Sequence, residues 1–258
     1  MIIKKTHIIS IVVFILLLGM GKPPFLSAQE IDLNHFINDS TYTNVDNLSA
    51  AINSGLSNSL IQVIHALNPL QVNLSFNKVW THISEEQRTG VLSNTQNLSF
   101  PVVQLEVGLP QRIHLIGRGM SFEIGETKKE RAVLWGVGAR YSMFQDSSNV
   151  RTGIVAFYEE LNNIDDFSVK SLVFQGYIGY QFRYVHVYVA PVAVRSTFHI
   201  HLNDAENPNG SYNESRVASY LKFSAGAHIY ITKRVSLTGN VVLGEYAAIG
   251  LGGSIRFF

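Results

Sequence analysis

The chain has 258 residues, of which 15% are charged, with a net charge of +1, no cysteine, 20 glycines, 15 phenylalanines and 11 tyrosines. The balanced charge excludes a nucleic-acid-binding protein, because no basic surplus is left to neutralise phosphates. The absence of cysteine excludes a small exported domain held by disulfides. After residue 28 no apolar run reaches about 18 residues, which excludes a bundle of membrane-spanning helices.

Residues 1–28 have the layout of a secretory signal peptide. Two lysines precede an apolar run from Ile8 to Met20, and Ser27-Ala28 form a small-residue exit. The run is shorter than the roughly 20 residues that cross a bilayer as a helix, which argues against an uncleaved anchor. We therefore expect an exported chain whose mature form starts at Gln29.

Residues 29–70 are not strand-like and contain one predicted amphipathic helix. Its apolar residues recur at helical spacing: Leu48, Ala51, Ile52, Leu56, Leu60, Ile64 and Leu67. Asn47 is a suitable N-cap, Gly55 weakens the middle, and Pro69 ends the pattern. About 40 residues are too few for an independent core. The apolar face of this helix therefore needs a partner in the rest of the chain.

From residue 71 the apolar period changes to two, which is typical of half-exposed strands. In residues 133–143 and 221–231, apolar side chains occupy one face, and Arg140 and Lys222 lie on the other. Ten strands are predicted, at about 71–83, 98–109, 112–124, 131–144, 151–161, 167–181, 184–200, 218–231, 235–243 and 247–258. Strands that cross a membrane must close on themselves. The prediction for residues 71–258 is an all-β, antiparallel, transmembrane up-and-down β-barrel; eight or twelve strands are the alternatives.

The predicted connections alternate in length. The long ones, 84–97, 125–130 and 201–217, all fall on one side, and the short turns at 110–111, 182–183 and 232–234 fall on the other. Outer-membrane barrels have long extracellular loops and short periplasmic turns, whereas a soluble β-sandwich, the alternative, needs no such parity. We expect the N-terminal helix to plug or lid the periplasmic end of this barrel.

Several motifs resemble a known family. Ile52-Asn53-Ser54-Gly55-Leu56, the turn Gly108-Leu109-Pro110 and the strand Trp135-Gly136-Val137-Gly138 are similar to an uncharacterised outer-membrane family of Bacteroidota-type bacteria, a domain of unknown function within the wider porin superfamily. The resemblance covers roughly residues 48–200 and implies no activity. The last strand resembles the terminal signal read by the barrel assembly machinery, with Phe257 and Phe258 on opposite faces.

Two weak candidate sites lie near strand ends. His82 and Ser84, followed by two glutamates, place a base near a nucleophile, in an arrangement that faintly resembles lipid A deacylases. His199 and His201 share a strand face and precede acidic loop residues, a spacing that suits a zinc-like ion. For both, solvated strand ends and loops are the simpler interpretation.

Five charged residues are predicted to line the lumen: Glu106, Arg140, Lys170, His186 and Lys222. They line a conduction path or contact a polar solute, or else they fill the small lumen and hold the barrel wall together.

The sequence thus predicts a porin-like barrel in the outer membrane of a Gram-negative bacterium. Its expected partners are outer-membrane lipid and the assembly machinery, with no nucleic acid and no cofactor. The predicted function is structural, or passive transport of a small hydrophobic or amphiphilic solute. A lipid-modifying enzyme at His82 and Ser84 and an adhesion or recognition barrel built on the polar loop 203–217 are the alternatives.

Overall fold

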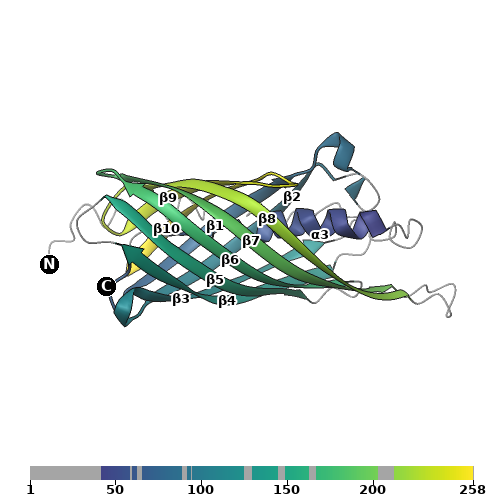
Figure 1. The fold of residues 1–258 in the computed structure, drawn as a ribbon, viewed down its shortest axis with the longest axis horizontal. Coiled ribbons are helices and arrows are strands. Elements are labelled where there is room, and N and C mark those ends of the chain that lie inside the picture. Colours follow the sequence, from purple (N-terminus) through teal and green to yellow (C-terminus); the bar gives the residue numbers. More distant parts are fainter. Residues whose placement is uncertain are drawn as a thin grey trace.

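In the computed structural model the chain forms a closed β-barrel with a helix in its lumen (Figure 1). The structure describes residues 42–58, 60–62, 66–88, 92–93, 95–124, 130–144, 149–162, 167–202 and 212–257. The predicted signal peptide (1–28), the start of the mature chain (29–41), most of the polar loop (203–211) and Phe258 lie outside these residues.

Ten antiparallel strands follow one another around the barrel in chain order, and β1 closes it against β10. The strands are β1 (Val72–His82), β2 (Asn97–Gly108), β3 (Ile113–Ile124), β4 (Glu130–Phe144), β5 (Val150–Asn162), β6 (Phe167–Gln181), β7 (Val185–Leu202), β8 (Tyr212–Tyr230), β9 (Val235–Leu243) and β10 (Ala248–Phe257). Every strand pairs with two neighbours, so the sheet has no edge strand, as a strand protein in lipid requires. The predicted number of strands and the up-and-down order are confirmed.

The strand bounds agree with the predicted ones to within about two residues, apart from one clear difference. Strand β8 begins at Tyr212, not at 218, and its polar first residues pair with the end of β7, from Leu202↔Tyr212 onward. This part of the β7–β8 hairpin extends past the end of β9, so neither face of it has to be apolar. The hydrophobic pattern used to predict the strand therefore missed it.

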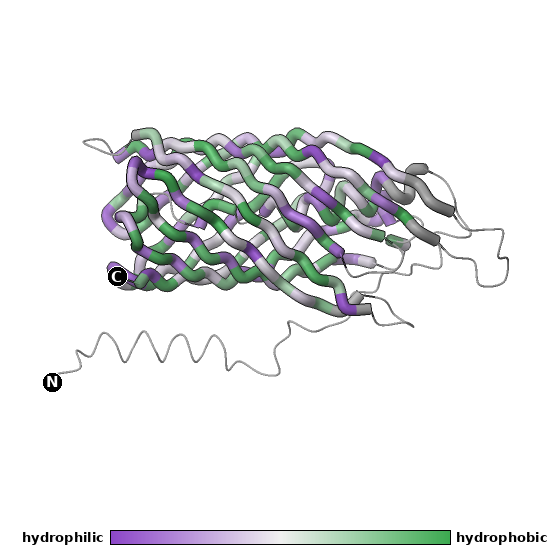
Figure 2. The backbone as a smooth tube through the Cα atoms, turned by 90° about the horizontal axis from the view of Figure 1, so that it is seen from below, coloured by the Kyte–Doolittle hydropathy of each residue, from purple (hydrophilic) through white to green (hydrophobic). Residues whose placement is uncertain are grey.

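Side chains alternate between the two faces of the wall. Large apolar residues such as Val137, Ile154, Phe174 and Leu251 are exposed on the outside, and their neighbours along the strands are buried inside. Figure 2 shows the same alternation as apolar and polar colours that change along each strand. An outer face of this kind suits contact with lipid chains.

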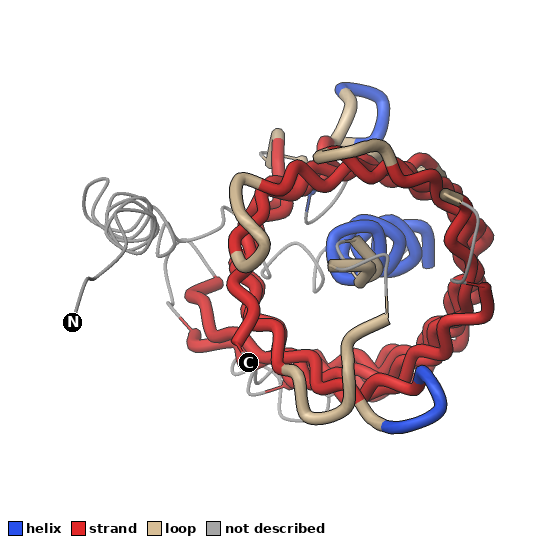
Figure 3. Tube along the Cα trace, turned by 90° about the vertical axis from the view of Figure 1, so that its left-hand side faces the viewer, coloured by secondary structure: helices blue, strands red, loops and turns tan. Residues whose placement is uncertain are grey.

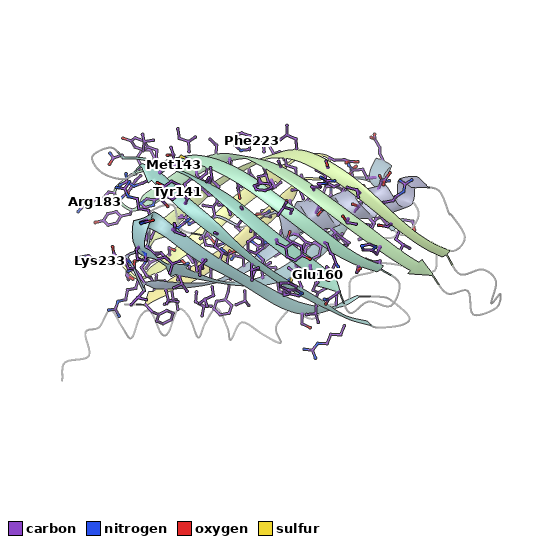
Figure 4. The ribbon with its side chains drawn as sticks, turned by 60° about the horizontal axis from the view of Figure 1, so that its bottom comes forward. Tyr141, Met143, Glu160, Arg183, Phe223 and Lys233 are labelled. Atoms are coloured by element: carbon purple, nitrogen blue, oxygen red, sulfur yellow. The ribbon has the colours of Figure 1, made fainter. Side chains whose placement is uncertain are left out.

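The two longest connections lie at one end of the barrel. Short turns, including the one-turn 3-10 helix Pro110–Arg112, lie at the end where β10 finishes. Arg183 and Lys233 are exposed in two of these turns, and Figure 4 places both at this end, while Phe223 projects from the wall. The connections at the opposite end include residues 83–96 and 203–211, so the predicted parity is present. We call these the inner and outer ends, since short turns face the periplasm in outer-membrane barrels.

The helix α3 (Tyr42–Leu56) lies inside the ring of strands (Figure 3). It begins earlier than predicted, with Asn47 inside it, and ends at Leu56, well before Leu67. Its end has a specific cause. The guanidinium of Arg118 on β3 donates to the carbonyl oxygens of Leu56 (2.5 Å) and Asn58 (3.1 Å), which takes up acceptors that a helix end leaves free. No described helix is long and apolar enough to cross a membrane.

The described parts of residues 42–70 contact the wall at points from the outer end of the lumen to the inner end. Asp46 contacts the outer part of β8, the Leu67 N–H meets His114 near the start of β3, and the Leu70 N–H bonds to Gly108 O at the end of β2. The helix therefore occupies the half of the lumen that we call outer (Figure 1), whereas the sequence led us to expect a plug or lid at the periplasmic end. Its apolar face needs apolar partners, and these lie on the outer halves of the strands.

Candidate functional site in the barrel lumen

The outer half of the lumen is an apolar compartment built around α3. Leu48, Ile52 and Leu56 of the helix pack against buried apolar side chains from the outer parts of the wall. These wall residues include Val79, Phe100, Phe122, Leu134, Leu161, Phe167, Val169, Phe198, Ile200 and Val242. Water-filled porins have polar interiors. This compartment instead suits an apolar occupant, and in this structure that occupant is the helix.

Gly55 lets the helix approach the wall closely. A Cβ at this position would lie 2.3 Å from Cε2 of Phe100 and 2.9 Å from Oγ1 of Thr81, far inside van der Waals contact. Sequence reasoning treated this glycine only as a weak point of the helix. Its role depends on which wall the helix faces, and that is a tertiary property.

Polar contacts fasten the helix to β6, β7 and β8. The Asn53 side-chain oxygen accepts hydrogen bonds from the hydroxyls of Ser171 (3.0 Å) and Ser196 (2.8 Å). The Ser49 hydroxyl lies 2.7 Å from the Tyr220 hydroxyl, and Asp46 forms an exposed ion pair with Arg216 at 2.9 Å. These are reversible, noncovalent attachments.

The inner half of the lumen carries a buried charge cluster. The Glu106 Oε1 lies 2.7 Å from Nη2 of Arg140 and 2.8 Å from Nδ1 of His114. The other ring nitrogen of His114 lies 3.2 Å from the Leu67 N, which donates to it, and Nδ1 also lies 2.6 Å from Nη2 of Arg140. The cluster thus joins the end of the lumen segment to three strands, β2, β3 and β4.

A second group of charged side chains lies between the apolar compartment of the outer half and the charge cluster of the inner half. Besides capping the helix, Arg118 donates to Oε1 of Gln104 at 3.1 Å and lies 3.6 Å from a carboxylate oxygen of Glu159. Lys222 is buried beside them, with its ammonium group 5.3 Å from the centre of the Tyr220 ring. An apolar compartment therefore ends on a layer of charged side chains.

A hollow of about 470 Å³ opens beside the start of α3. Asp46, Arg216, Tyr220 and Glu245 are among its lining residues. It lies between the helix and β8, where the strand extends past β9. The outer mouth is thus polar, whereas the compartment beneath it is apolar.

Four of the five residues predicted to line the lumen are buried inside the barrel: Glu106, Arg140, His186 and Lys222. Lys170 is not, and here the prediction is wrong. Its side chain is 47% exposed on the outer surface and lies 3.7 Å from Glu160. The neighbouring Val169 points inward, because the lumen at this level is apolar and packs on the helix. The rule that charges face the lumen fails where the lumen is not aqueous.

The weak catalytic pair is not brought together. The exposed His82 ring lies 3.2 Å from the Asn97 side-chain oxygen. The Ser84 hydroxyl instead donates to Oε1 of Gln87 at 2.9 Å. Ser84 is the residue that directly precedes the short 3-10 helix Glu85–Gln87. The serine therefore serves as a capping residue in this structure.

The structure describes only part of the suggested metal site. His199 lies on the outward-facing side of β7, between the buried Phe198 and Ile200. The side chain of His201 and the acidic loop residues Asp204 and Glu206 fall outside the described part. Among the described side chains, no group of three histidine or acidic residues is close enough to hold a metal ion.

Other functional residues were missed by sequence reasoning, chiefly His114, Glu159, Asn53 and the role of Arg118. The available signal was an arginine between apolar neighbours on an irregular strand, which marks a buried charge that needs partners.

Of the two residues of the predicted assembly signal, Phe257 is exposed on the outer face, whereas Phe258 lies outside the described residues.

No protein-family model and no curated protein matches this sequence. Several solved structures match it with low TM-scores. The Neisserial surface protein A matches with a TM-score of 0.34 and 10% identity, over 72% of this chain and 95% of that one. The transport unit of the autotransporter AIDA-I from Escherichia coli matches with a TM-score of 0.38 and 14% identity, over 83% and 99%. A de novo designed transmembrane β-barrel matches with a TM-score of 0.32 and 10% identity, over 75% and 100%.

These similarities concern the barrel fold alone. The closed ladder and the apolar outer face of this chain are what a barrel in the bacterial outer membrane requires. The chain is an outer-membrane β-barrel protein.

Proposed function

We propose that this protein is a passive, non-enzymatic barrel that admits a small hydrophobic or amphiphilic molecule, and that residues 42–70 close its lumen at rest. The observation that carries the proposal is that the described parts of this segment contact the wall at both ends of the lumen, through Asp46 at the outer end and Leu67 and Leu70 at the inner end. A purely structural barrel of this size is usually filled by the side chains of its own wall. Here a separate segment fills it through reversible contacts.

The chemistry of the lumen supports an amphiphilic cargo. The outer half offers an apolar lining, and the charged layer of Arg118, Glu159 and Lys222 lies beneath it. A molecule with an apolar chain and a polar head matches that order, because each part meets groups of its own polarity. A small hydrophilic solute would have to cross the apolar half without compensation.

Removal of the lumen segment tests the closure. Deletion of residues 29–68 should leave a heat-modifiable barrel and raise its ion conductance in planar bilayers, whereas the full-length protein should stay closed. Conductance is expected because the wall alone leaves the helix volume open to water. A deletion variant that folds as a barrel yet conducts no better than the full-length protein would refute the plug.

Transport itself is tested by uptake. Intact Gram-negative cells that express the protein should take up fluorescent dodecanoic acid faster than cells with an empty vector. Equal rates, with the barrel shown to be in the outer membrane, would refute the proposed cargo class. Vancomycin sensitivity serves as a control for general leakage.

We further infer that the chain belongs to the uncharacterised Bacteroidota-type family which its Trp135-Gly136-Val137-Gly138 strand resembles, and that residues 1–28 direct its export. The mature N-terminal peptide of the outer-membrane protein, identified by mass spectrometry, should begin at Gln29 in its free or pyroglutamyl form.

A further inference from the structure

The ladder between β2 and β3 stops halfway along the wall. The two strands pair from Gly108↔His114 to Val103↔Gly119, which is six pairs. Beyond that point both strands continue toward the outer end. Asn97–Val102 pairs with β1 only, and Met120–Ile124 pairs with β4 only. The described part of the wall thus contains a seam without ladder pairing, in its outer half.

A proline explains where the pairing ends. The Leu109 N–H donates to Ile113 O, so the odd-numbered residues of β2 form the hydrogen bonds to β3. Two residues beyond Val103↔Gly119, the same register would place Pro101 opposite Ser121. Proline has no N–H, and within sheets it is confined mainly to edges and bulges. The ladder ends at the first place where it would need this donor.

The other proline in a strand shows that a missing donor alone makes no seam. Pro191 on β7 also interrupts its ladder to β6, but pairing resumes after two residues, with Gln175↔Val192 on one side and Ile178↔Val189 on the other. Pro191 is also among the residues that line a hollow of about 620 Å³ on the wall. Pro191 is therefore a matched control for Pro101.

Side chains close the seam from within. The rings of Phe100 and Phe122 meet edge to face, with centroids 5.6 Å apart and an interplanar angle of 86°. Val102 and Met120 are buried below them, and all four residues belong to the apolar compartment around α3. Directly behind Phe100 lies Gly55 of the helix. Movement of these rings and of the helix would open the apolar compartment to the outside of the wall without breaking a strand ladder.

We propose that this β2–β3 seam is a lateral opening through which a single-chain amphiphile moves between the outer leaflet and the lumen. The proposal rests on the proposed transport function and names its route. The apolar chain passes between Phe100 and Phe122. Arg118, two residues before Met120 on the same strand, begins the charged layer that receives the polar head. By this route the amphiphile reaches the lumen without passing through the polar outer mouth.

A covalent staple tests the route in this naturally cysteine-free chain. Val102→Cys with Met120→Cys joins the next residues in register across the seam, at a non-hydrogen-bonded position where side chains lie close. Val173→Cys with Val194→Cys forms the control across the paired β6–β7 ladder, also at buried, non-hydrogen-bonded positions. Both pairs are oxidised in intact cells, and uptake of fluorescent dodecanoic acid is measured before and after reduction.

The oxidised seam staple should lower uptake by about tenfold or more, because it removes the open state, and reduction should restore the rate. The control staple should leave uptake at the wild-type rate. Full uptake through a completely oxidised seam staple would overturn the lateral route while leaving the transport function standing. Wild-type uptake equal to that of the empty vector would overturn both.

A second variant covers the case in which the staple forms poorly. Pro101→Thr restores the missing donor and favours extension of the ladder, so it should also slow uptake, whereas Pro191→Thr should not. Equal uptake by the two threonine variants would count against the seam.

Discussion

At the residue scale, the buried cluster of Glu106, His114 and Arg140 depends on mutual compensation. Glu106 contacts both partners at 2.7 and 2.8 Å, and each of the three side chains is almost fully buried. A buried charge without its partner is strongly unfavourable. The cluster therefore supports the inner half of the barrel only while it is complete.

Glu106→Gln should destabilise the barrel by about 3 kcal/mol, because it leaves the Arg140 charge buried without its carboxylate. Urea unfolding of the detergent-refolded protein measures this effect. Lys170→Gln is the control. It breaks an exposed pair on the outer surface and should cost less than about 1 kcal/mol. A similar small loss in both variants would show that the buried pair contributes no more than the exposed one.

At the scale of elements, the fit of α3 in the lumen depends on one glycine. In an isolated helix, alanine in place of glycine is favourable by roughly 0.5–1 kcal/mol. Inside this barrel the added methyl group would overlap the buried Phe100 ring. Local propensity and tertiary packing therefore predict opposite signs for the same substitution.

We expect packing to dominate. Gly55→Ala should destabilise the full-length barrel by about 1–3 kcal/mol through overpacking and raise the frequency of conducting events in planar bilayers. Gly117→Ala serves as the control, because no atom lies within 4 Å of the added methyl group on β3. A Gly55→Ala protein that is more stable than wild type and stays closed would contradict the seated position of the helix.

At the scale of the whole molecule, the direction of the lumen segment determines which parts of it reach the cell surface. Asp46 lies at the outer mouth with 53% of its side chain exposed, while Lys233 lies in a turn at the inner end. A helix that closed the periplasmic end would place Asp46 on the other side of the membrane.

Asp46→Cys should react with a membrane-impermeant maleimide on intact cells, because the native chain has no competing cysteine. Lys233→Cys should react only after the outer membrane is permeabilised. The reverse pattern would mean that the barrel, or the segment inside it, has the opposite orientation.

The sequence by itself determined the wall of this protein. Strand number, approximate bounds, loop parity and the outward apolar face all follow from a period of two and from turn residues, which are local properties. A single residue's shift would turn a whole strand inside out, so the pattern constrains each strand strongly. Four of the five proposed lumen residues are inside for the same reason.

Only the tertiary structure decided what fills the wall. The amphipathic helix was visible in the sequence, but its place in the outer half depends on apolar residues from many strands. Once it is there, the lumen around it is apolar, which explains why Lys170 lies outside and why Gly55 is needed. The partners of Glu106 and the end of the β2–β3 ladder likewise depend on which residues of other strands lie opposite. These are long-range relations, and no local pattern contains them.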